Sequence, residues 1–231
     1  MNLDGVLDDF YENHYEKLHG EGALGLGGKL MHSFLERGRS ATHHHSKVLE
    51  LGCGNFEHFP YLKHNWDEFT AVDLRVPSDI EARNFMAVNG TKFVKSDVST
   101  LPFEDNSFDR VLATCLVLHI QELPNALEEW QRVTRKSGFI DLLIPCETGV
   151  AHRFMRSLVS KPNARRRGID SKSWKLINAL DHVNSFPRAI SLLEASIIDG
   201  RSLEISFFPF GFLPSPDVNL FARATIGPIV P

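Results

Sequence analysis

The sequence predicts an α/β protein built around a mostly parallel β-sheet. Short apolar runs alternate along the chain with stretches of helical periodicity, which is typical of strands joined by crossover helices. One apolar run stops at a Gly-Cys-Gly triplet, where a strand would turn into a helix. The length of 231 residues suits one principal domain, because a single core can grow to roughly 250 residues before it splits.

Five apolar runs predict the parallel strands. They are Lys47 to Leu51, Phe69 to Val72, Phe93 to Lys95, Arg110 to Cys115 and Ile140 to Ile144. Helical periodicity fills some of the intervals, as from Pro124 to Arg132. Two later runs, Leu203 to Phe208 and Leu220 to Thr225, predict two final strands.

The N-terminal segment is expected to be helical. An apolar stripe that includes Tyr11 and Tyr15 predicts a first helix from Asp8 to His19. A glycine-rich break follows at Gly20 to Gly28, and a second helix is expected from about Lys29 to Arg37.

The segment after Pro145 changes the rhythm of the chain. About 45 residues there have mostly helical periodicity and predict a helical lid over a substrate pocket. We therefore expect a single domain with an N-terminal helical cap (1–45), a cofactor-binding core (46–146), a lid insertion (147–200) and C-terminal strands (201–231).

Composition restricts the class of partner and the compartment. The net charge of −4 gives no overall field that would attract nucleic acid. The three cysteines lie far apart and form no C-x-x-C pair, so neither a disulfide framework nor a metal site is expected, and a reducing cytoplasm fits best. The sequence has neither the pattern of a secretory signal nor an apolar stretch of membrane-spanning length.

The glycine triplet is the strongest chemical signal. It closes the run Val48 to Gly54, and glycine there lets the backbone turn sharply and approach a ligand closely. A dinucleotide-binding fingerprint would need glycine or alanine at its last position, where this chain has Glu57. The NAD interpretation is therefore disfavoured.

The order of the motifs resembles class I S-adenosylmethionine-dependent methyltransferases, in particular the type-11 methyltransferase domain family. Gly52 to Phe56 resembles the family's first motif, with Phe56 standing where a third glycine is common. Leu101 to Asp109 resembles the family's "LPF…D-x-S-F-D" segment, and Arg132 to Gly138 resembles its "R-V-L-K-P-G-G" turn with three departures. The resemblance covers Leu49 to Ile144, about 40% of the chain.

That resemblance implies a fold, a cofactor and a set of donor-binding residues. The implied fold is a Rossmann-like seven-stranded sheet with an antiparallel last strand and helices on both faces. The implied cofactor is S-adenosylmethionine, with Asp73 accepting from the ribose hydroxyls and Asp97 from the adenine amino group. The expected cofactor-binding residues are Glu50, Gly52, Cys53, Gly54, Asp73, Leu74, Asp97, Val98 and Thr114, with Tyr11 and Tyr15 closing over the donor. A helix N-cap is the alternative role for either aspartate.

Two histidines are candidates for the catalytic base. His119 follows the fourth strand, where ligands bind in open α/β sheets, and its near-neutral pKa suits proton transfer. His182 lies in the expected lid. A histidine on the surface or in the core is the alternative for both.

The stretch from His152 to Lys175 is strongly basic, with eight Lys and Arg residues against Asp170 alone, a local charge of +7. A solvated helix face is one interpretation. Another is that Arg165, Arg166 and Arg167 bind an acceptor that carries a carboxylate or phosphate. A membrane-surface role is a third, disfavoured because the stretch shows no clear amphipathic aromatic face.

The sequence therefore predicts a methyltransferase that acts on a small-molecule acceptor, anionic on the second interpretation, as a monomer or homodimer. Two rivals remain open, an enzyme of the same fold that binds S-adenosylmethionine without methyl transfer and a non-catalytic partner subunit. The sequence does not indicate whether the methylated atom is oxygen, nitrogen or carbon.

Overall fold

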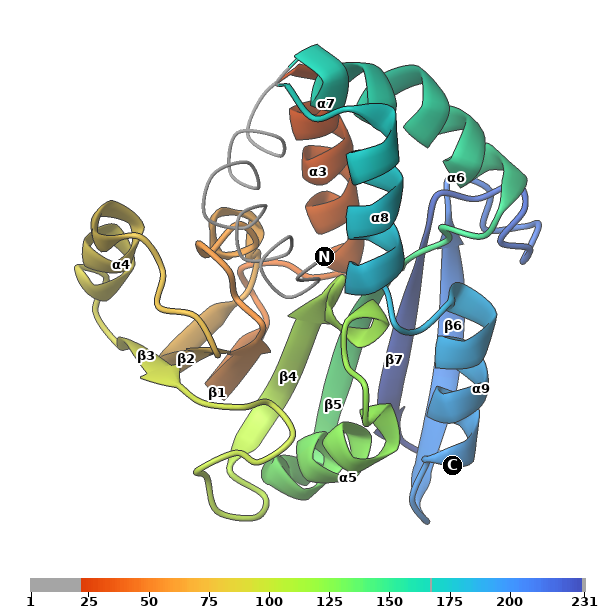
Figure 1. Ribbon diagram of the computed structural model, residues 1–231. Helices are drawn as coiled ribbons and strands as arrows, with labels where there is room; N and C mark the ends of the chain where they lie inside the picture. Colours follow the sequence, from red (N-terminus) through yellow and green to blue (C-terminus); the bar gives the residue numbers. More distant parts are fainter. Residues whose placement is uncertain (1–21, 167, 230–231) are drawn as a thin grey trace.

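A seven-stranded sheet forms the centre of the molecule (Figure 1). The computed structural model describes residues 22–166 and 168–229. The strands are β1 (His44–Leu51), β2 (Asn65–Asp73), β3 (Thr91–Lys95), β4 (Phe108–Thr114), β5 (Thr134–Pro145), β6 (Arg201–Phe208) and β7 (Phe221–Pro228), in the spatial order β3-β2-β1-β4-β5-β7-β6. Only β7 runs antiparallel to its neighbours β5 and β6. The prediction of a mostly parallel sheet with an antiparallel last strand is confirmed.

Helices cover both faces of this sheet. They are α3 (Gly22–Leu35), α4 (Asp79–Met86), α5 (Leu123–Val133), α6 (Val150–Met155), α7 (Lys161–Arg166), α8 (Ser171–Asp181) and α9 (Phe186–Ala195). Three short helical turns join them, namely η1 (Phe59–Tyr61), η2 (Leu116–Leu118) and the π-helical η3 (Arg156–Ser160). No helix among the described residues is long and apolar enough to cross a membrane.

The side-chain alternation along β5 separates the two layers. Ile140, Leu142 and Ile144 point to one face and join the core formed with α5 and α9. Leu143 points to the other face and packs against Phe34 of α3. A buried strand that is apolar on both faces is what a parallel sheet covered by helices requires.

Helix α5 fixes the loop that follows β3. Its apolar residues recur every three or four positions and are buried, Trp130 completely. The indole Nε1 of Trp130 donates a 2.9 Å hydrogen bond to the carbonyl oxygen of Val98. Since Val98 follows Asp97, this bond positions the segment expected to meet the donor.

Helix α3 begins earlier than the sequence predicted. It starts at Gly22 rather than near Lys29, so the expected glycine-rich break is helical from Gly22 onwards. Glycine lowers helix propensity by about 1 kcal/mol per residue without forbidding a helix. Packing of the carboxyl half of α3, through Phe34 and Leu35, outweighs that cost.

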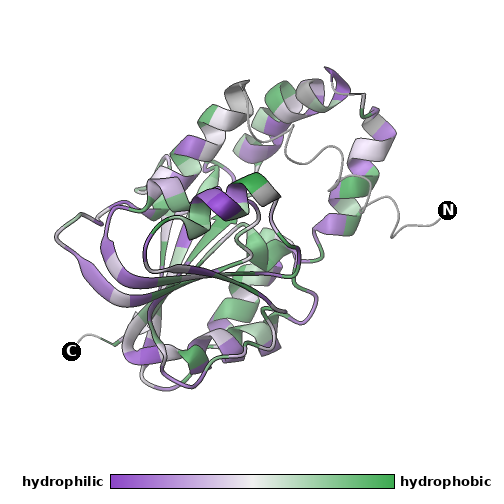
Figure 2. Ribbon diagram, turned by 90° about the vertical axis from the view of Figure 1, so that its left-hand side faces the viewer, coloured by the Kyte–Doolittle hydropathy of each residue, from purple (hydrophilic) through white to green (hydrophobic). Residues whose placement is uncertain are grey.

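The expected lid divides into two parts. From Val150 to Asp181, α6, η3, α7 and α8 form an antiparallel pair of helical arms above the carboxyl ends of the strands, here called the lid hairpin (Figure 1). Its helices mix hydrophobic and hydrophilic residues (Figure 2). By contrast, α9 packs its buried Phe186, Ala189 and Leu193 into the sheet core. It is therefore a layer helix rather than part of a lid.

A buried charged network ties the end of α3 to the sheet. Arg110 of β4 is fully buried, and its guanidinium lies 2.7 Å from the Glu36 carboxylate and 2.9 Å from the Asp141 carboxylate. Arg39 reaches the same oxygen of Asp141 at 2.9 Å. Opposite charges are needed at such positions because a lone buried charge is very costly.

Candidate functional site

The turn Gly52–Gly54, here called the glycine turn, follows β1 at the carboxyl edge of the sheet. Gly52 and Gly54 both adopt positive φ angles, 63° and 53°, which glycine tolerates best. The N–H groups of Gly52 and Cys53 donate to the carbonyl oxygen of Val72 at 2.8 and 3.1 Å. A Cβ atom on Gly52 would lie 2.7 Å from Leu116 of η2, so the turn and the loop after β4 are in close contact.

Phe56 keeps the backbone conformation of the glycine that it replaces. Its φ angle is 62°, in the left-handed region where a bulky side chain is strained. Its ring stacks on Phe85 of α4, with centroids 4.1 Å apart and planes 7° apart. Burial and stacking therefore offset the strain, and Phe56 preserves the turn.

Asp73 closes β2 beside the glycine turn. Its Oδ2 accepts from the Gly54 N–H and its Oδ1 from the Arg75 N–H, both at 2.9 Å. Each carboxylate oxygen can accept a further bond, so Asp73 retains capacity for two hydroxyl donors. Leu74, next in the chain, is 59% exposed and offers an apolar surface beside it.

Glu50 is buried under the same turn with no hydrogen-bond partner for either carboxylate oxygen among the described residues. Burial, reinforced by the nearby Glu57, raises the pKa of Glu50 well above its ordinary range. A buried polar group without a partner costs free energy unless a ligand or water satisfies it. Glu50 is therefore suited to a cationic or N–H donor from a ligand.

The ends of β3 and β4 supply the remaining expected donor-site positions. Asp97 is exposed and accepts from the Ser99 N–H at 2.8 Å, while the side chain of Val98 belongs to the core. Thr114 ends β4 and is partly exposed. Cys53 turns its thiol into the aromatic cluster around Phe56, so any contact with a donor would come from its backbone.

His119 lies beside the end of the lid hairpin. Its Nδ1 is 3.0 Å from the carbonyl oxygen and 3.2 Å from a carboxylate oxygen of Asp181. A carbonyl oxygen can only accept, so Nδ1 carries the proton and the lone pair is on Nε2. His182 packs edge-on against His119 at 4.9 Å, and burial together with His119 lowers the pKa of His182 to about 4.

Asn184 holds the two halves of this arrangement together. It is buried, and its Nδ2 donates to the carbonyl oxygens of Val117 at 3.0 Å and Ile120 at 2.6 Å. Its backbone N–H donates to the carbonyl oxygen of Leu118 at 3.0 Å. These bonds fix the loop that carries His119 against the chain segment that carries His182.

Two further ionisable groups, His152 and Arg156, lie near His182, and Glu147 lies near Arg156. His152 is on α6, and burial, with Arg156 and His182 nearby, lowers the pKa of His152 to about 4. Arg156 donates to Asn178 of α8 at 3.1 Å. Glu147 follows β5, and burial raises its pKa. The Nδ1 of His152 and the Oε2 of Glu147 are buried without a hydrogen-bond partner in the described part of the chain.

The structure brings some of the expected residues together and leaves others apart. Glu50, the glycine turn and Asp73 adjoin one another, and η2 connects them to His119 and His182. Arg165 and Arg166 are exposed at the end of α7, thirteen or more residues from His152 along a helix, which is roughly 20 Å. The cation beside His182 is instead Arg156. Tyr11, Tyr15 and Arg167 lie outside the described residues.

His119, Asp181 and His182 are also a candidate ligand set for a divalent cation, because one ligand atom from each lies within 4.8 Å of the others. Two imidazoles and a carboxylate suit a transition metal. The contact between Nδ1 of His119 and the Asp181 carboxylate already occupies part of that set. His182 joins the pair through its ring contact with His119, and the three are here called the histidine cluster.

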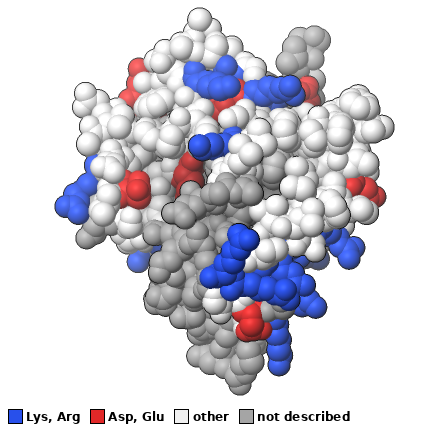
Figure 3. Space-filling view, turned by 90° about the horizontal axis from the view of Figure 1, so that it is seen from above, with Lys and Arg blue, Asp and Glu red and all other residues white. Residues whose placement is uncertain are grey.

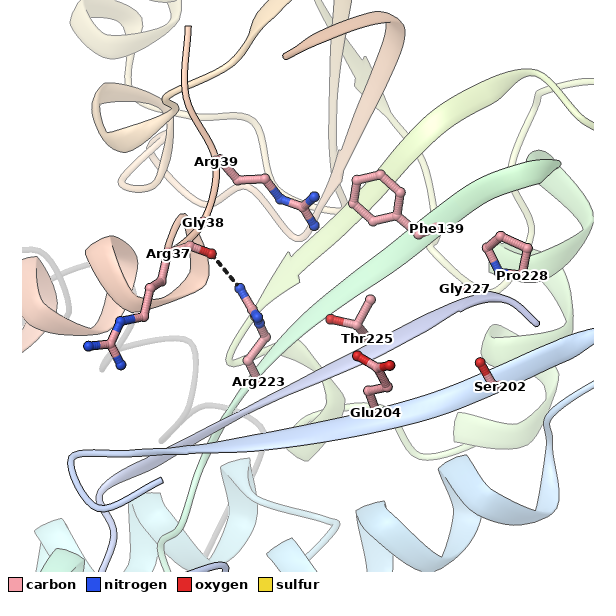
Figure 4. Close-up of a pocket in the computed structure, with 10 residues that line it drawn as sticks. All are labelled: Arg37, Gly38, Arg39, Phe139, Ser202, Glu204, Arg223, Thr225, Gly227 and Pro228. Atoms are coloured by element: carbon pink, nitrogen blue, oxygen red, sulfur yellow. Dashed lines mark hydrogen bonds between the residues drawn. The ribbon is translucent and has the colours of Figure 1, made fainter. Parts of the chain in front are cut away.

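A separate hollow of about 380 Å³ lies on the α3 face of the sheet (Figure 4). It is away from the glycine turn, at the amino-terminal half of β5. The guanidinium of Arg39 lies 4.2 Å over the Phe139 ring, and Arg223 donates to the carbonyl oxygen of Arg37 at 2.9 Å. These arginines make contacts within the protein, and we assign the hollow no ligand.

The family can now be stated from sequence comparison. A family model described as a methyltransferase domain matches residues 49–141, from the last residues of β1 into β5. The matched residues belong to a methyltransferase domain, and the seven-stranded sheet around them has the class I fold. Solved structures of that fold include a methyltransferase in complex with S-adenosylhomocysteine.

Relatives of the methyltransferase domain act on varied acceptors. Malonyl-[acyl-carrier protein] O-methyltransferase of Salmonella typhimurium is 26% identical over 141 residues, 61% of this chain and 49% of that protein. Phosphatidylethanolamine N-methyltransferase of Cereibacter sphaeroides is 29% identical over 162 residues, 66% of this chain and 75% of that protein. The chain spans about half the length of the first curated relatives it matches.

Solved structures support the fold over almost the whole length. The plantazolicin methyltransferase BpumL, solved with a substrate analogue and S-adenosylhomocysteine, has a TM-score of 0.60 and 14% identity, covering 96% of this chain and 89% of that one. At that identity the likeness concerns the fold alone.

Several residues around the site escaped sequence reasoning. Asp181, Asn184, Arg156, His152 and Glu147 all lie after β5, beyond the segment that carries the family motifs. The available signal was the spacing of Asp181, His182 and Asn184 within the predicted helical stretch after Pro145, because polar side chains at a helix end often bind backbone or ligand.

Proposed function

We propose that this protein transfers a methyl group from S-adenosylmethionine to a small-molecule acceptor that binds at the histidine cluster. The observation that supports the proposal is the contact between Gly52 of the glycine turn and Leu116 of η2, because His119 follows η2 directly in the chain. The sulfonium of the donor already activates the methyl group. The protein must therefore align the acceptor with it and exclude water.

The donor half of the site fits the cofactor. Gly52 and Gly54 hold the turn in positive φ conformations beside Asp73, and Asp73 would accept from the ribose hydroxyls. The orphaned carboxyl of Glu50 would be satisfied by a ligand ammonium or N–H group. Asp97 and Leu74 stand at the carboxyl ends of neighbouring strands, where an adenine would lie.

The acceptor half of the site supports a role for His119 in proton transfer. Asp181 fixes the tautomer of His119 and leaves Nε2 able to take a proton from an attacking hydroxyl or amine. His182 is a poorer base, since its pKa is lowered to about 4, and we assign it to positioning.

A finer part of the proposal concerns the acceptor's charge. Arg156 and the neighbouring histidines suit an acceptor with an acidic group, because guanidinium pairs well with carboxylate or phosphate. Among the relatives, one is named for a malonyl group and another for a phospholipid. We therefore propose an acceptor that bears an acidic group near the methylated atom.

The decisive experiment separates the two halves of the site. Asp73→Ala should weaken S-adenosylhomocysteine binding roughly ten- to hundredfold, because hydrogen bonds to a charged group contribute about 1.5–3 kcal/mol. His119→Ala should keep that affinity and lower kcat by about a hundredfold or more. Calorimetry measures the first quantity, and S-adenosylhomocysteine release during turnover measures the second.

Folding of both variants is checked by circular dichroism. Equal loss of donor affinity in both variants would contradict the division of the site. The wild type could instead bind the donor and release no S-adenosylhomocysteine with any acidic or neutral acceptor tested. That result would overturn methyl transfer and favour a non-catalytic binding subunit.

A further inference from the structure

The outer face of the first arm of the lid hairpin is apolar and exposed. Val150, Phe154 and Leu158 lie four residues apart and are 66, 62 and 57% exposed. A helix that covers a core hides such residues. Here the buried or half-buried positions of the same arm are occupied by His152, Arg156 and Ala164, so the apolar residues have been left facing outward.

The loop between β6 and β7 adds protruding aromatic side chains next to the start of that arm. Phe212 is 80% exposed and Phe210 43%, with their rings 6.0 Å apart. The N–H of Ala151 donates to the carbonyl oxygen of Asp217 at 2.8 Å, which joins the loop to α6.

The loop is held in this shape by internal bonds. Asn219 is fully buried, and its Nδ2 donates to the carbonyl oxygens of Leu213 at 2.7 Å and Ser215 at 2.9 Å. Its Oδ1 accepts from the Phe210 N–H at 2.7 Å. Phe212 is therefore exposed on a loop whose shape is fixed by hydrogen bonds. The exposure is a property of the folded state, and exposed apolar groups of this kind mark interaction sites.

Charge accompanies this surface. From Val150 to Arg166 the chain has five Lys and Arg residues and no Asp or Glu. Arg153 lies next to Phe154 on α6 and Arg166 at the end of α7, and both are exposed. Seen from above, basic side chains gather at several places beside a broad uncharged area (Figure 3). Because the whole molecule has a net charge of −4, this positive charge is local.

We propose that the outer face of α6 and η3, with the β6–β7 loop, docks on an anionic lipid bilayer. Phenylalanine, valine and leucine flanked by arginine are the composition of segments that lie in the membrane interface. The exposed apolar side chains come from two segments that the bond between Ala151 and Asp217 joins, and a deformable lipid surface can contact both segments at once. Basic residues beside them attract anionic headgroups.

Docking in this orientation brings the bilayer close to the proposed acceptor site. The inner side of the same arm carries His152 and Arg156, so the surface and the site are separated by about one helix diameter, roughly 10 Å. The sequence offered no clear aromatic face here because Phe212 comes from a distant loop and the π-helical η3 shifts the periodicity after Met155.

Flotation with lipid vesicles tests the proposal without any methyl transfer. At low salt the wild-type protein should bind vesicles of phosphatidylcholine that contain about 30% phosphatidylglycerol. It should bind vesicles of pure phosphatidylcholine far less. Phe154→Ser should weaken binding about tenfold. Arg153→Gln with Arg166→Gln should weaken it about 25-fold, since each basic residue contributes roughly a factor of five.

The matched control is Ile80→Ser on α4, because Ile80 is as exposed as Val150, at 66%, but belongs to a helix remote from the lid hairpin. Its vesicle binding should equal that of the wild type. S-adenosylhomocysteine affinity should stay unchanged in all variants, which shows that they are folded. Absence of wild-type binding to anionic vesicles, or equal weakening by Ile80→Ser, would overturn the proposal. In the first case a soluble acidic protein becomes the partner to seek.

Discussion

Glu50 shows how a single residue can be unfavourable in the free protein and useful in the complex. Its carboxyl is buried beneath the glycine turn without a hydrogen-bond partner among the described residues, and burial raises its pKa well above the ordinary range. Glu50→Gln keeps the shape and removes the capacity for charge. We expect its melting temperature to match the wild type and its S-adenosylhomocysteine affinity to fall at least tenfold.

The measurement is a pair of thermal melts with calorimetry. Unchanged affinity would show that the Glu50 carboxyl does not meet the donor. A large fall in melting temperature would instead show that the carboxyl has a structural partner.

Arg156 provides the residue-scale test of an acidic acceptor. Arg156→Gln should raise KM for an acidic acceptor by about ten- to hundredfold, because a charge-assisted pair is lost, and should leave donor affinity unchanged. Arg166→Gln is the matched control, since Arg166 is exposed at the far end of α7. A KM that responds equally to both changes, or to neither, would contradict a specific role for Arg156.

Residues inside the family motifs could be predicted, and residues outside them could not. Asp73 and the glycines stand where the resemblance placed them, because strand ends and turns are local features. Asp109, at the end of the segment that resembles the family's motif, has a structural partner, because it accepts from the Lys47 N–H at 2.8 Å. Asp181 and Asn184 were missed because their partners lie in η2 or directly after it, more than sixty residues earlier in the chain.

The conformation of the turn after β1 predicts the relative stabilities of two variants at Phe56. Phe56 holds a left-handed conformation that costs other residues about 1–2 kcal/mol and glycine almost nothing. Both Phe56→Ala and Phe56→Gly lose the buried ring, so both should reduce the free energy of unfolding by about 2–5 kcal/mol. Phe56→Gly should nevertheless be the more stable of the two by about 1 kcal/mol.

Urea unfolding of the two variants measures that difference. In an ordinary conformation alanine would be the better residue, because glycine loses more chain entropy on folding. A Phe56→Ala protein more stable than Phe56→Gly would therefore show that the turn does not hold a positive φ angle in solution.

At the level of elements, strands were easier to predict than helix limits. β4 and β5 were found from their apolar runs because burial on both faces leaves a plain signal. The start of α3 was missed because glycine reduces local propensity while distant packing decides the outcome. The function of α9 was missed because its contacts are with the sheet, which periodicity alone does not reveal.

Considered as a whole, the molecule should be sensitive to mild acid. Burial lowers the pKa values of six described histidines. The pKa falls to about 3 for His32 and to about 4 for His64, His152 and His182. Burial also lowers the pKa values of His45 and His58. As the pH falls below 6.5, the unfolded chain therefore binds protons at these sites more readily than the folded chain does. Stability must therefore fall as the pH decreases from 6.5 towards 4.

Two carboxyls oppose this trend, because the raised pKa values of Glu50 and Glu147 favour the folded state at low pH. Among the described residues the shifted histidines outnumber these carboxyls, so unfolding takes up protons over this pH range. We expect the melting temperature to decrease steadily between pH 6.5 and about 4.5, as scanning calorimetry can measure. A melting temperature that is constant or rises over that interval would contradict the burial of these histidines in neutral form.

The network of Glu36, Arg110 and Asp141 has an evolutionary consequence. The three side chains come from the end of α3, from β4 and from β5, and the buried guanidinium of Arg110 pairs with both carboxylates. Loss of one partner strands a buried charge, whereas joint replacement by apolar residues of similar volume is often tolerated. Among relatives that keep this helix on this sheet, the three positions should therefore change together, and an alignment should record them as a covarying set.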